Sequence, residues 1–207
     1  MVASQAPELY LDWLDLAAAP GFAGVDGRFG MTILPGRRCN GVTAKHPRDL
    51  ARDAATLAAL GVDVFVLLVE DHELTACGVP AFITTLGDHG IPVIRFPIVD
   101  HGTPNDRSTA DHAPSHRPDS VGPDPDPDPD PGNIAAFAAV VREIQSRLRA
   151  GQTLGVSCHG GLGRTGMLAA CLLKDAGLNA DVAIAAVRRS RPGAIETVGQ
   201  EAFVRDW

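Results

Sequence analysis

The residues of this chain whose types and spacing could support a chemical reaction lie together at positions 156–166. Cys158 and Arg164 enclose five residues, three of which are glycines. Glycines let the backbone curl so that successive N–H groups point inward, and such a nest fits a tetrahedral dianion. An arginine at its end can hold two oxygens of a phosphate at once, which a lysine cannot do. We therefore predict a phosphate-binding loop made of His159, Gly160, Gly161, Leu162, Gly163 and Arg164.

Cys158 stands at the mouth of this loop. The donors that bind an anion also favour the thiolate form of a neighbouring cysteine, and the thiolate is the nucleophilic form. Its attack on phosphorus would give a phosphocysteine intermediate that water later cleaves, so one difficult displacement becomes two easier ones. This chemistry needs neither a metal nor another cofactor, and we predict none.

The elements on either side of the loop must place it at the edge of a sheet. Residues 153–157 form a short apolar segment typical of a strand, and residues 165–176 continue as an apolar helix. In α/β sheets, ligands bind outside the carboxyl ends of strands, where the N-terminus of a helix offers unpaired N–H groups and a positive dipole end. A loop between these two elements is therefore well placed to bind phosphate.

Other interpretations of the segment compete. Cys158 taken alone could be a packing residue, but three glycines and an arginine at this spacing argue against it. Residues 161–166 also satisfy the dinucleotide fingerprint GxGxxG. That site requires an acidic residue after a second strand about 20 residues on, whereas residues 187–191 are basic and helical in pattern. A Walker loop fails because no Lys-Ser or Lys-Thr pair follows the glycines.

Apolar segments and chain breakers alternate in the order of an α/β layered fold. We predict strands over residues 62–69, 91–98 and 153–157, with weaker candidates at 10–16 and 29–34. Helices are expected over residues 47–60, 80–90, 165–176 and 179–189, from Val198 onward, and from a cap at Asn133 to about residue 148. The prediction is one domain over residues 1–207, with a central, largely parallel sheet flanked by helices. Residues 106–132, which end in a Pro-Asp repeat, are predicted to be a disordered acidic insert.

Composition disfavours several classes of function. The chain of 207 residues carries a formal net charge of −7, which disfavours nucleic acid and anionic membranes as partners. It has no apolar run long enough to cross a bilayer, and its first ten residues lack Lys and Arg, so we expect a cytoplasmic location. The spacing of the four cysteines predicts neither a disulfide framework nor a zinc site, and Cys39, Cys77 and Cys171 are expected to be packing residues.

The chain resembles the protein-tyrosine and dual-specificity phosphatase superfamily, whose signature is Cys, five residues, Arg, then Ser or Thr. The closer likeness is to the kinase-associated phosphatase branch, the proteins similar to cyclin-dependent kinase inhibitor 3. It extends over residues 34–36, 98–104, 158–173 and 191–197, and covers most of the chain apart from the N-terminus and the acidic insert. The resemblance implies the cysteine-phosphatase fold and action on phosphorylated proteins.

Three further site residues are implied by the resemblance. Asp100 would be a general acid on a movable loop, and it follows the predicted strand of residues 91–98, at the same kind of sheet edge as Cys158. Thr165 would hydrogen-bond the departing thiolate, and Gln200 would position the hydrolytic water. One position departs from the family pattern, because Ser157 stands where the family usually has histidine.

We therefore expect a metal-independent phosphatase that hydrolyses phosphotyrosine, with phosphoserine and phosphothreonine as further candidates, in a phosphorylated protein or peptide. The alternative is a phosphoprotein-binding pseudophosphatase with weak or no turnover, disabled by Ser157 or by a misplaced Asp100. His159 is expected either at the rim of the pocket or exposed on the loop. Because the loop lacks lysines, a polyphosphorylated substrate is less expected.

Overall fold

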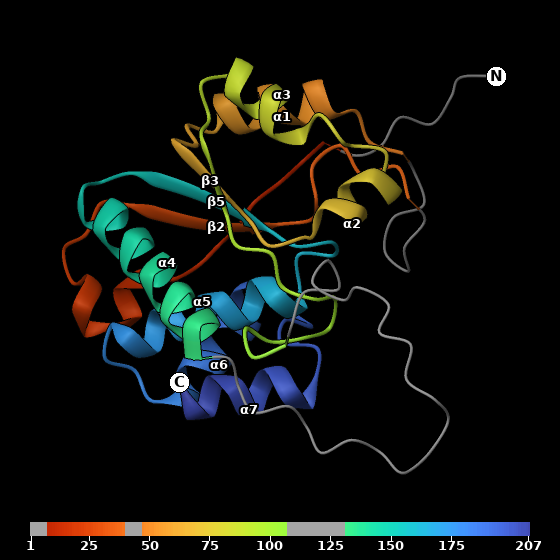
Figure 1. Cartoon of the computed structure of the whole chain (residues 1–207). Helices are drawn as coiled ribbons and strands as arrows, with labels where there is room; N and C mark the ends of the chain where they lie inside the picture. Colours follow the sequence, from red (N-terminus) through yellow and green to blue (C-terminus); the bar gives the residue numbers. More distant parts are fainter. Residues whose placement is uncertain (1–7, 40–46, 107–130) are drawn as a thin grey trace, which may run out of the picture.

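The computed structural model describes residues 8–39, 47–106 and 131–207, so the predicted insert lies almost entirely outside the described residues. Within the described residues, five strands form one sheet in the order β1-β2-β5-β3-β4 (Figure 1). Their bounds are β1 Asp12–Trp13, β2 Arg28–Thr32, β3 Val64–Leu67, β4 Val93–Arg95 and β5 Thr153–Ser157. Neighbouring strands are parallel except β1 and β2, which are antiparallel. The predicted fold class is confirmed.

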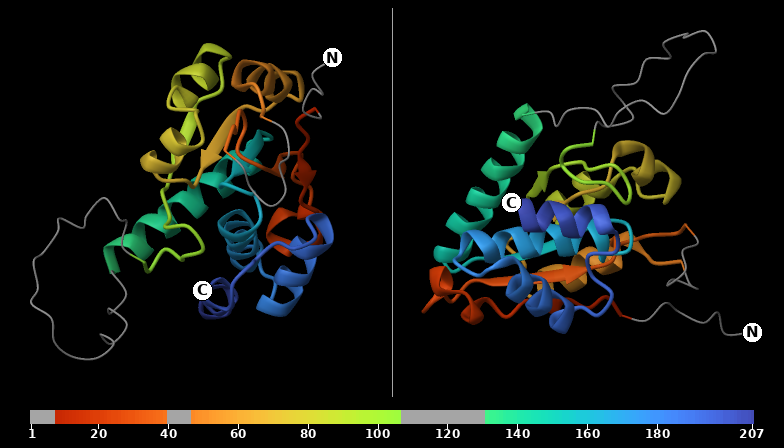
Figure 2. Two further views of the ribbon diagram at one scale, coloured as in Figure 1. Left: turned by 90° about the vertical axis from the view of Figure 1, so that its right-hand side faces the viewer. Right: turned by 90° about the horizontal axis from the view of Figure 1, so that it is seen from below.

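Helices cover both faces of this sheet (Figure 1, Figure 2). On one face lie α1 Leu50–Ala59 and α3 Phe82–Asp88, which contact each other. On the other face lie α4 Pro131–Arg149, α5 Gly163–Asp175, α6 Ala180–Ser190 and α7 Val198–Asp206. The short helix α2 Asp71–Ala76 follows β3, and the 3₁₀ turns η1 Leu16–Ala18 and η2 Pro20–Phe22 lie between β1 and β2.

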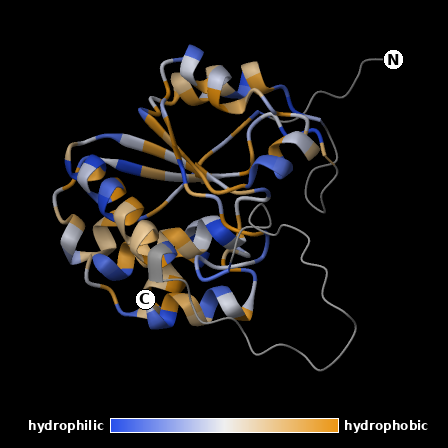
Figure 3. Ribbon diagram, viewed as in Figure 1, coloured by the Kyte–Doolittle hydropathy of each residue, from blue (hydrophilic) through white to orange (hydrophobic). Residues whose placement is uncertain are grey.

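The core lies between the sheet and these helices. Hydrophobic and hydrophilic residues alternate along most helices, which gives each an apolar side (Figure 3). Helix α5 is the exception, because every residue from Gly163 to Leu173 is buried, as expected for a helix enclosed on all sides. It packs on α4, α6, α7 and the central strand β5. No helix among the described residues is long and apolar enough to span a bilayer.

Strand register sets the position of the predicted loop. Ser157, the last residue of β5, is paired with Thr32 at the end of β2 and with Leu67 at the end of β3. Three parallel strands therefore end at one level, and the chain segments that leave β2 and β3 flank the loop that leaves β5. This is the sheet edge where we expected an anion to bind.

The predicted elements exist, but three details were wrong. Helix α1 begins at Leu50 after a cap at Asp49, rather than at Pro47. Helix α4 begins at Pro131 rather than after a cap at Asn133. The Asn133 amide donates instead to the carbonyl of Pro104, so it is engaged with another segment. Helix α2 was missed because it is only six residues long and its start is set by a capping box between Glu70 and Glu73, rather than by apolar periodicity.

Candidate active site

The loop of residues 158–164 joins the carboxyl end of β5 to the first turn of α5. Three of its carbonyl groups accept hydrogen bonds from outside the loop: His159 from Leu34 N at 3.2 Å, Gly160 from Arg191 Nη2 at 3.1 Å, and Leu162 from Ile195 N at 3.2 Å. In a trans peptide unit the N–H points away from the C=O. Tethering the carbonyls outward therefore turns the following N–H groups toward the inside of the curl, which is the form of an anion nest.

Gly161 is required by space, whereas Gly163 faces only the ends of the Glu196 and Gln200 side chains. Gly161 has φ +71°, and a Cβ atom there would lie 2.0 Å from the carbonyl oxygen of Thr32. A Cβ atom on Gly163 would lie 2.8 Å from the side-chain amide of Gln200. Gly160 is different, because a Cβ atom there would meet nothing within 4 Å.

Arg191 ties the loop to the first strand. Its guanidinium donates to Gly160 and forms an ion pair with Asp12 of β1. Only 5% of Arg191 is exposed. Asp12 thus fixes the side chain of Arg191, and Arg191 fixes the middle of the loop through Gly160.

Arg164 is fixed by a carboxylate that the sequence analysis did not identify. Its two terminal nitrogens donate to the two oxygens of Glu73 at 2.7 and 2.8 Å, and Nη1 also donates to the carbonyl of Ile98. Both side chains are buried. Burial opposes the charged form, but the hydrogen bonds that Arg164 donates to Glu73 and the charges of Cys158, Glu73 and Asp100 outweigh it, so the pKa of Arg164 is raised. The guanidinium is therefore charged and held in one plane.

Asp100 reaches the same guanidinium from another segment. It follows β4, as predicted, and its Oδ1 accepts a hydrogen bond of 2.8 Å from Arg164 Nη2. The Asp100 side chain is 49% exposed, whereas that of Arg164 is 1% exposed. Asp100 is thus the solvent-side partner of a buried arginine, and it lies at the site rather than at a distant turn.

Cys158 is a free, buried thiol near two arginines, Arg164 and Arg37. Arg37 is 2% exposed, and its Nη1 donates to the carbonyl of His159 at 3.3 Å. Its Nε and Nη2 have no hydrogen-bond partner among the residues that the structure describes. Burial lowers the pKa of Arg37, while the charge of Cys158 acts in the opposite direction. A buried cation with spare donors is costly unless an anion accompanies it. The sequence analysis missed Arg37, although it directly follows the resemblance segment 34–36.

Three other predicted residues are buried behind the loop. Thr165 and Ser157 are fully buried, and neither hydroxyl has a partner within the described part of the chain. Gln200 is also fully buried, so it is not a surface residue of a helix. Its amide donates to the carbonyl of Gly102 at 3.2 Å, and its oxygen accepts from Glu196 N at 3.1 Å. The catalytic roles assigned to Thr165 and Gln200 stay predictions.

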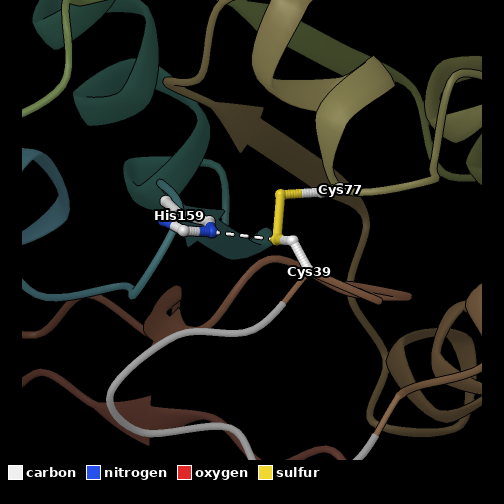
Figure 4. Close-up of side chains that lie close together, drawn as sticks. All are labelled: Cys39, Cys77 and His159. Carbon is white, nitrogen blue, oxygen red and sulfur yellow. Dashed lines mark hydrogen bonds between the residues drawn. A yellow bond between two sulfur atoms is a disulfide. The ribbon is translucent and has the colours of Figure 1, made fainter.

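The expectation for the cysteines was wrong in one respect. Cys39 and Cys77 form a disulfide with Cα atoms 4.5 Å apart, and His159 Nε2 lies 3.1 Å from Cys39 Sγ (Figure 4). The two cysteines are 38 residues apart in the sequence, so their spacing did not indicate a pair. His159 is half-buried rather than exposed, and burial and the charge of Arg37 lower its pKa. Cys171 is a buried packing residue, as expected, and burial raises its pKa.

Known proteins resemble this chain over different shares of its length. No protein-family model matches the chain. Human cyclin-dependent kinase inhibitor 3 is 26% identical over 204 residues, which are 96% of this chain and 78% of that protein. Mouse protein tyrosine phosphatase domain-containing protein 1 is 42% identical over 76 residues, 36% of this chain, and the chain spans only 10% of its length.

Solved structures agree with the curated relatives. Kinase-associated phosphatase with its catalytic cysteine replaced by serine superposes with a TM-score of 0.76 at 23% identity, covering 98% of this chain and 95% of that one. Tk-PTP in its active form has a TM-score of 0.56 at 25% identity and covers 91% and 94%. The fold is that of the cysteine phosphatases.

Proposed function

We propose that this chain is a cysteine-dependent protein phosphatase. The proposal rests on its similarity to the protein-tyrosine and dual-specificity phosphatases near the kinase-associated branch. One observation carries the proposal. Cys158 is a free thiol in a loop whose carbonyls are tied outward, next to an arginine whose plane is fixed by Glu73. A nucleophile and an anion nest are thus combined in one loop.

The first chemical step would be an in-line displacement. A phosphate monoester enters the nest, the Cys158 sulfur forms a bond to phosphorus, and the bond from phosphorus to the leaving oxygen breaks. Asp100 donates its proton to that oxygen. In the second step Asp100 takes a proton from water, the water oxygen attacks phosphorus, and Cys158 leaves as the thiolate. Thr165 is proposed to stabilise this thiolate, and Gln200 to orient the water.

Arg37 is proposed to stabilise the Cys158 thiolate, the role expected of the histidine that Ser157 replaces. Its positive charge interacts with Cys158, and two of its nitrogen donors are unused by the described residues. A nearby cation stabilises a thiolate. The alternative, a pseudophosphatase, rests on Ser157 or on a misplaced Asp100. Arg37 weakens the first argument, and the hydrogen bond of Asp100 with Arg164 weakens the second.

The substrate class is proposed to be phosphotyrosine in a protein or peptide, with phosphoserine and phosphothreonine as further candidates. The tyrosine phosphatase domain named in one relative supports the first of these candidates. A cytoplasmic location is also proposed, because a reducing compartment keeps the Cys158 thiol intact.

Release of phosphate from a generic aryl phosphate tests the proposal. Wild-type protein should turn over, Cys158→Ser should not, and Cys171→Ala, which changes a buried cysteine away from the loop, should retain activity. Cys158→Ser should still bind vanadate or sulfate, because the donors are mostly backbone, whereas Arg164→Ala should lose both binding and turnover. A wild-type protein that binds phosphopeptides without releasing phosphate would be the pseudophosphatase.

A further inference from the structure

We propose that Cys39, Cys77 and His159 form a zinc-binding site when the disulfide is reduced. The two sulfurs and one imidazole nitrogen all lie within 4.8 Å of one another (Figure 4). Thiolate and imidazole are the ligands that zinc favours in proteins. The proposal goes beyond the phosphatase activity and does not depend on it.

The distances suit tetrahedral coordination. Zinc bonds of about 2.3 Å to sulfur and about 2.0 Å to nitrogen place the donor atoms roughly 3.5–3.8 Å apart. His159 Nε2 already faces Cys39 Sγ at 3.1 Å, and the Cα atoms of the cysteines are 4.5 Å apart. Small side-chain rotations that separate the two sulfurs would therefore bring all three donors to bonding positions. The fourth position would be taken by water.

Three separate segments present the ligands, and backbone hydrogen bonds join these segments. Cys39 lies beyond β2, Cys77 directly follows α2, and His159 lies in the loop after β5. Arg38 N donates to the carbonyl of Cys77 at 2.9 Å, and Leu34 N donates to that of His159 at 3.2 Å. The ligands are thus held near one another by the fold, which lowers the ordering cost of binding an ion.

Charge also favours zinc. Cys77 is 3% exposed, and Cys39 and His159 are half-buried. Two thiolates and one Zn²⁺ sum to zero, so the occupied site adds no net charge to a partly desolvated region.

Zinc binding follows reduction of the disulfide. A dithiol reductant supplies two electrons and two protons to the Cys39–Cys77 bond, which breaks to give two thiols, while the reductant becomes a disulfide. Zn²⁺ then displaces the two thiol protons to solvent and binds the resulting thiolates and the neutral imidazole. A small-molecule disulfide that takes two electrons from the two thiolates, and is itself reduced to two thiols, would re-form the Cys39–Cys77 bond and release the ion.

Cobalt(II), a spectroscopic substitute for zinc, tests the site. Full-length Cys158→Ser protein, which lacks the nucleophilic thiolate as a competing ligand, is reduced, freed of reductant without oxygen and titrated with Co²⁺ and then Zn²⁺. One equivalent of Co²⁺ should give thiolate charge-transfer and tetrahedral d–d absorption, which Zn²⁺ abolishes. The same protein with its disulfide intact should give neither band.

Substitutions separate this site from adventitious binding. Cys77→Ser and His159→Gln should each weaken Zn²⁺ binding by more than about tenfold, because loss of even an outer partner of a ligand costs 10–100-fold. His89→Gln, an exposed histidine elsewhere, should not change it. Equal binding by the oxidised and reduced protein, or absence of the thiolate band from the reduced protein, would overturn the proposal. The comparison of oxidised with reduced protein uses no substitution at the site, so its result does not depend on whether a variant folds.

Discussion

Arg164 Nη2 donates a hydrogen bond of 2.8 Å to Asp100 Oδ1, so the proposed phosphate-binding group and the proposed general acid are partners of each other. While this bond persists, the carboxyl group is directed at the guanidinium rather than at a leaving oxygen. A phosphate that enters the loop competes with Asp100 for the same nitrogen. Substrate binding would therefore free the acid at the point where it is needed.

Asp100→Asn tests the acid role directly. Turnover of an ester with a poor leaving group should fall by roughly 10²–10⁴, the usual contribution of general acid catalysis. An ester of an acidic phenol should lose much less, because its leaving group needs no proton. The measurement is kcat on both substrates, and equal losses on the two would point to a structural role.

Glu73→Gln should weaken anion binding and stability together. The amide keeps the size of the carboxylate but offers one acceptor and no charge to a buried guanidinium, and hydrogen bonds to charged groups contribute about 1.5–3 kcal/mol. We expect a lower melting temperature and weaker inhibition by vanadate. Glu143→Gln, which breaks an exposed i,i+4 pair with Arg147, is the control and should change neither quantity. Unchanged vanadate inhibition in Glu73→Gln would contradict the positioning role.

Arg37→Met should slow the alkylation of Cys158. Removing a buried positive charge close to the sulfur disfavours the thiolate, and we expect about tenfold slower reaction with iodoacetamide near neutral pH. Arg38→Met changes the adjacent, exposed arginine and serves as the matched control. The assay is done with Cys39, Cys77 and Cys171 replaced, so that one thiol reports. If both variants alkylate at the wild-type rate, Ser157 is not compensated by Arg37.

The loop glycines should differ sharply in their tolerance of alanine. Gly161→Ala combines a φ of +71° with a contact of 2.0 Å to the Thr32 carbonyl, and we expect a loss of about 1–3 kcal/mol of unfolding free energy together with loss of vanadate binding. Gly160→Ala has open space around the new methyl group and should bind vanadate nearly as well as wild type. Chemical unfolding and vanadate titration measure both effects. Similar behaviour of the two variants would mean that the loop adjusts freely.

Removal of residues 107–130, replaced by a short Gly-Ser linker, should leave the melting temperature nearly unchanged. The Pro-Asp tract has almost no apolar surface to bury. Asp106 is retained because it accepts hydrogen bonds from Thr103. A large fall in melting temperature would show that the tract packs on the domain.

Sequence reasoning reached the layered fold and the loop because both depend on local signals. Apolar segments between glycines and prolines marked β3, β4 and β5, and the cysteine loop has its own spacing. Three features were not predicted, because each acts only through a contact with a distant segment: Glu73, Arg37 and the Cys39–Cys77 pair. Glu73 meets Arg164 across 91 residues, and Arg37 meets His159 across 122. Neither composition nor periodicity encodes such contacts.

The ion pair of Arg191 with Asp12 joins residues 179 positions apart, and the same guanidinium donates to the carbonyl of Gly160. A chain that grows from its N-terminus on the ribosome therefore carries Cys158 long before the loop around it can be braced. Because contacts between distant segments form late in folding, we expect phosphate binding by the loop to appear only once the segment after α6 has emerged from the ribosome.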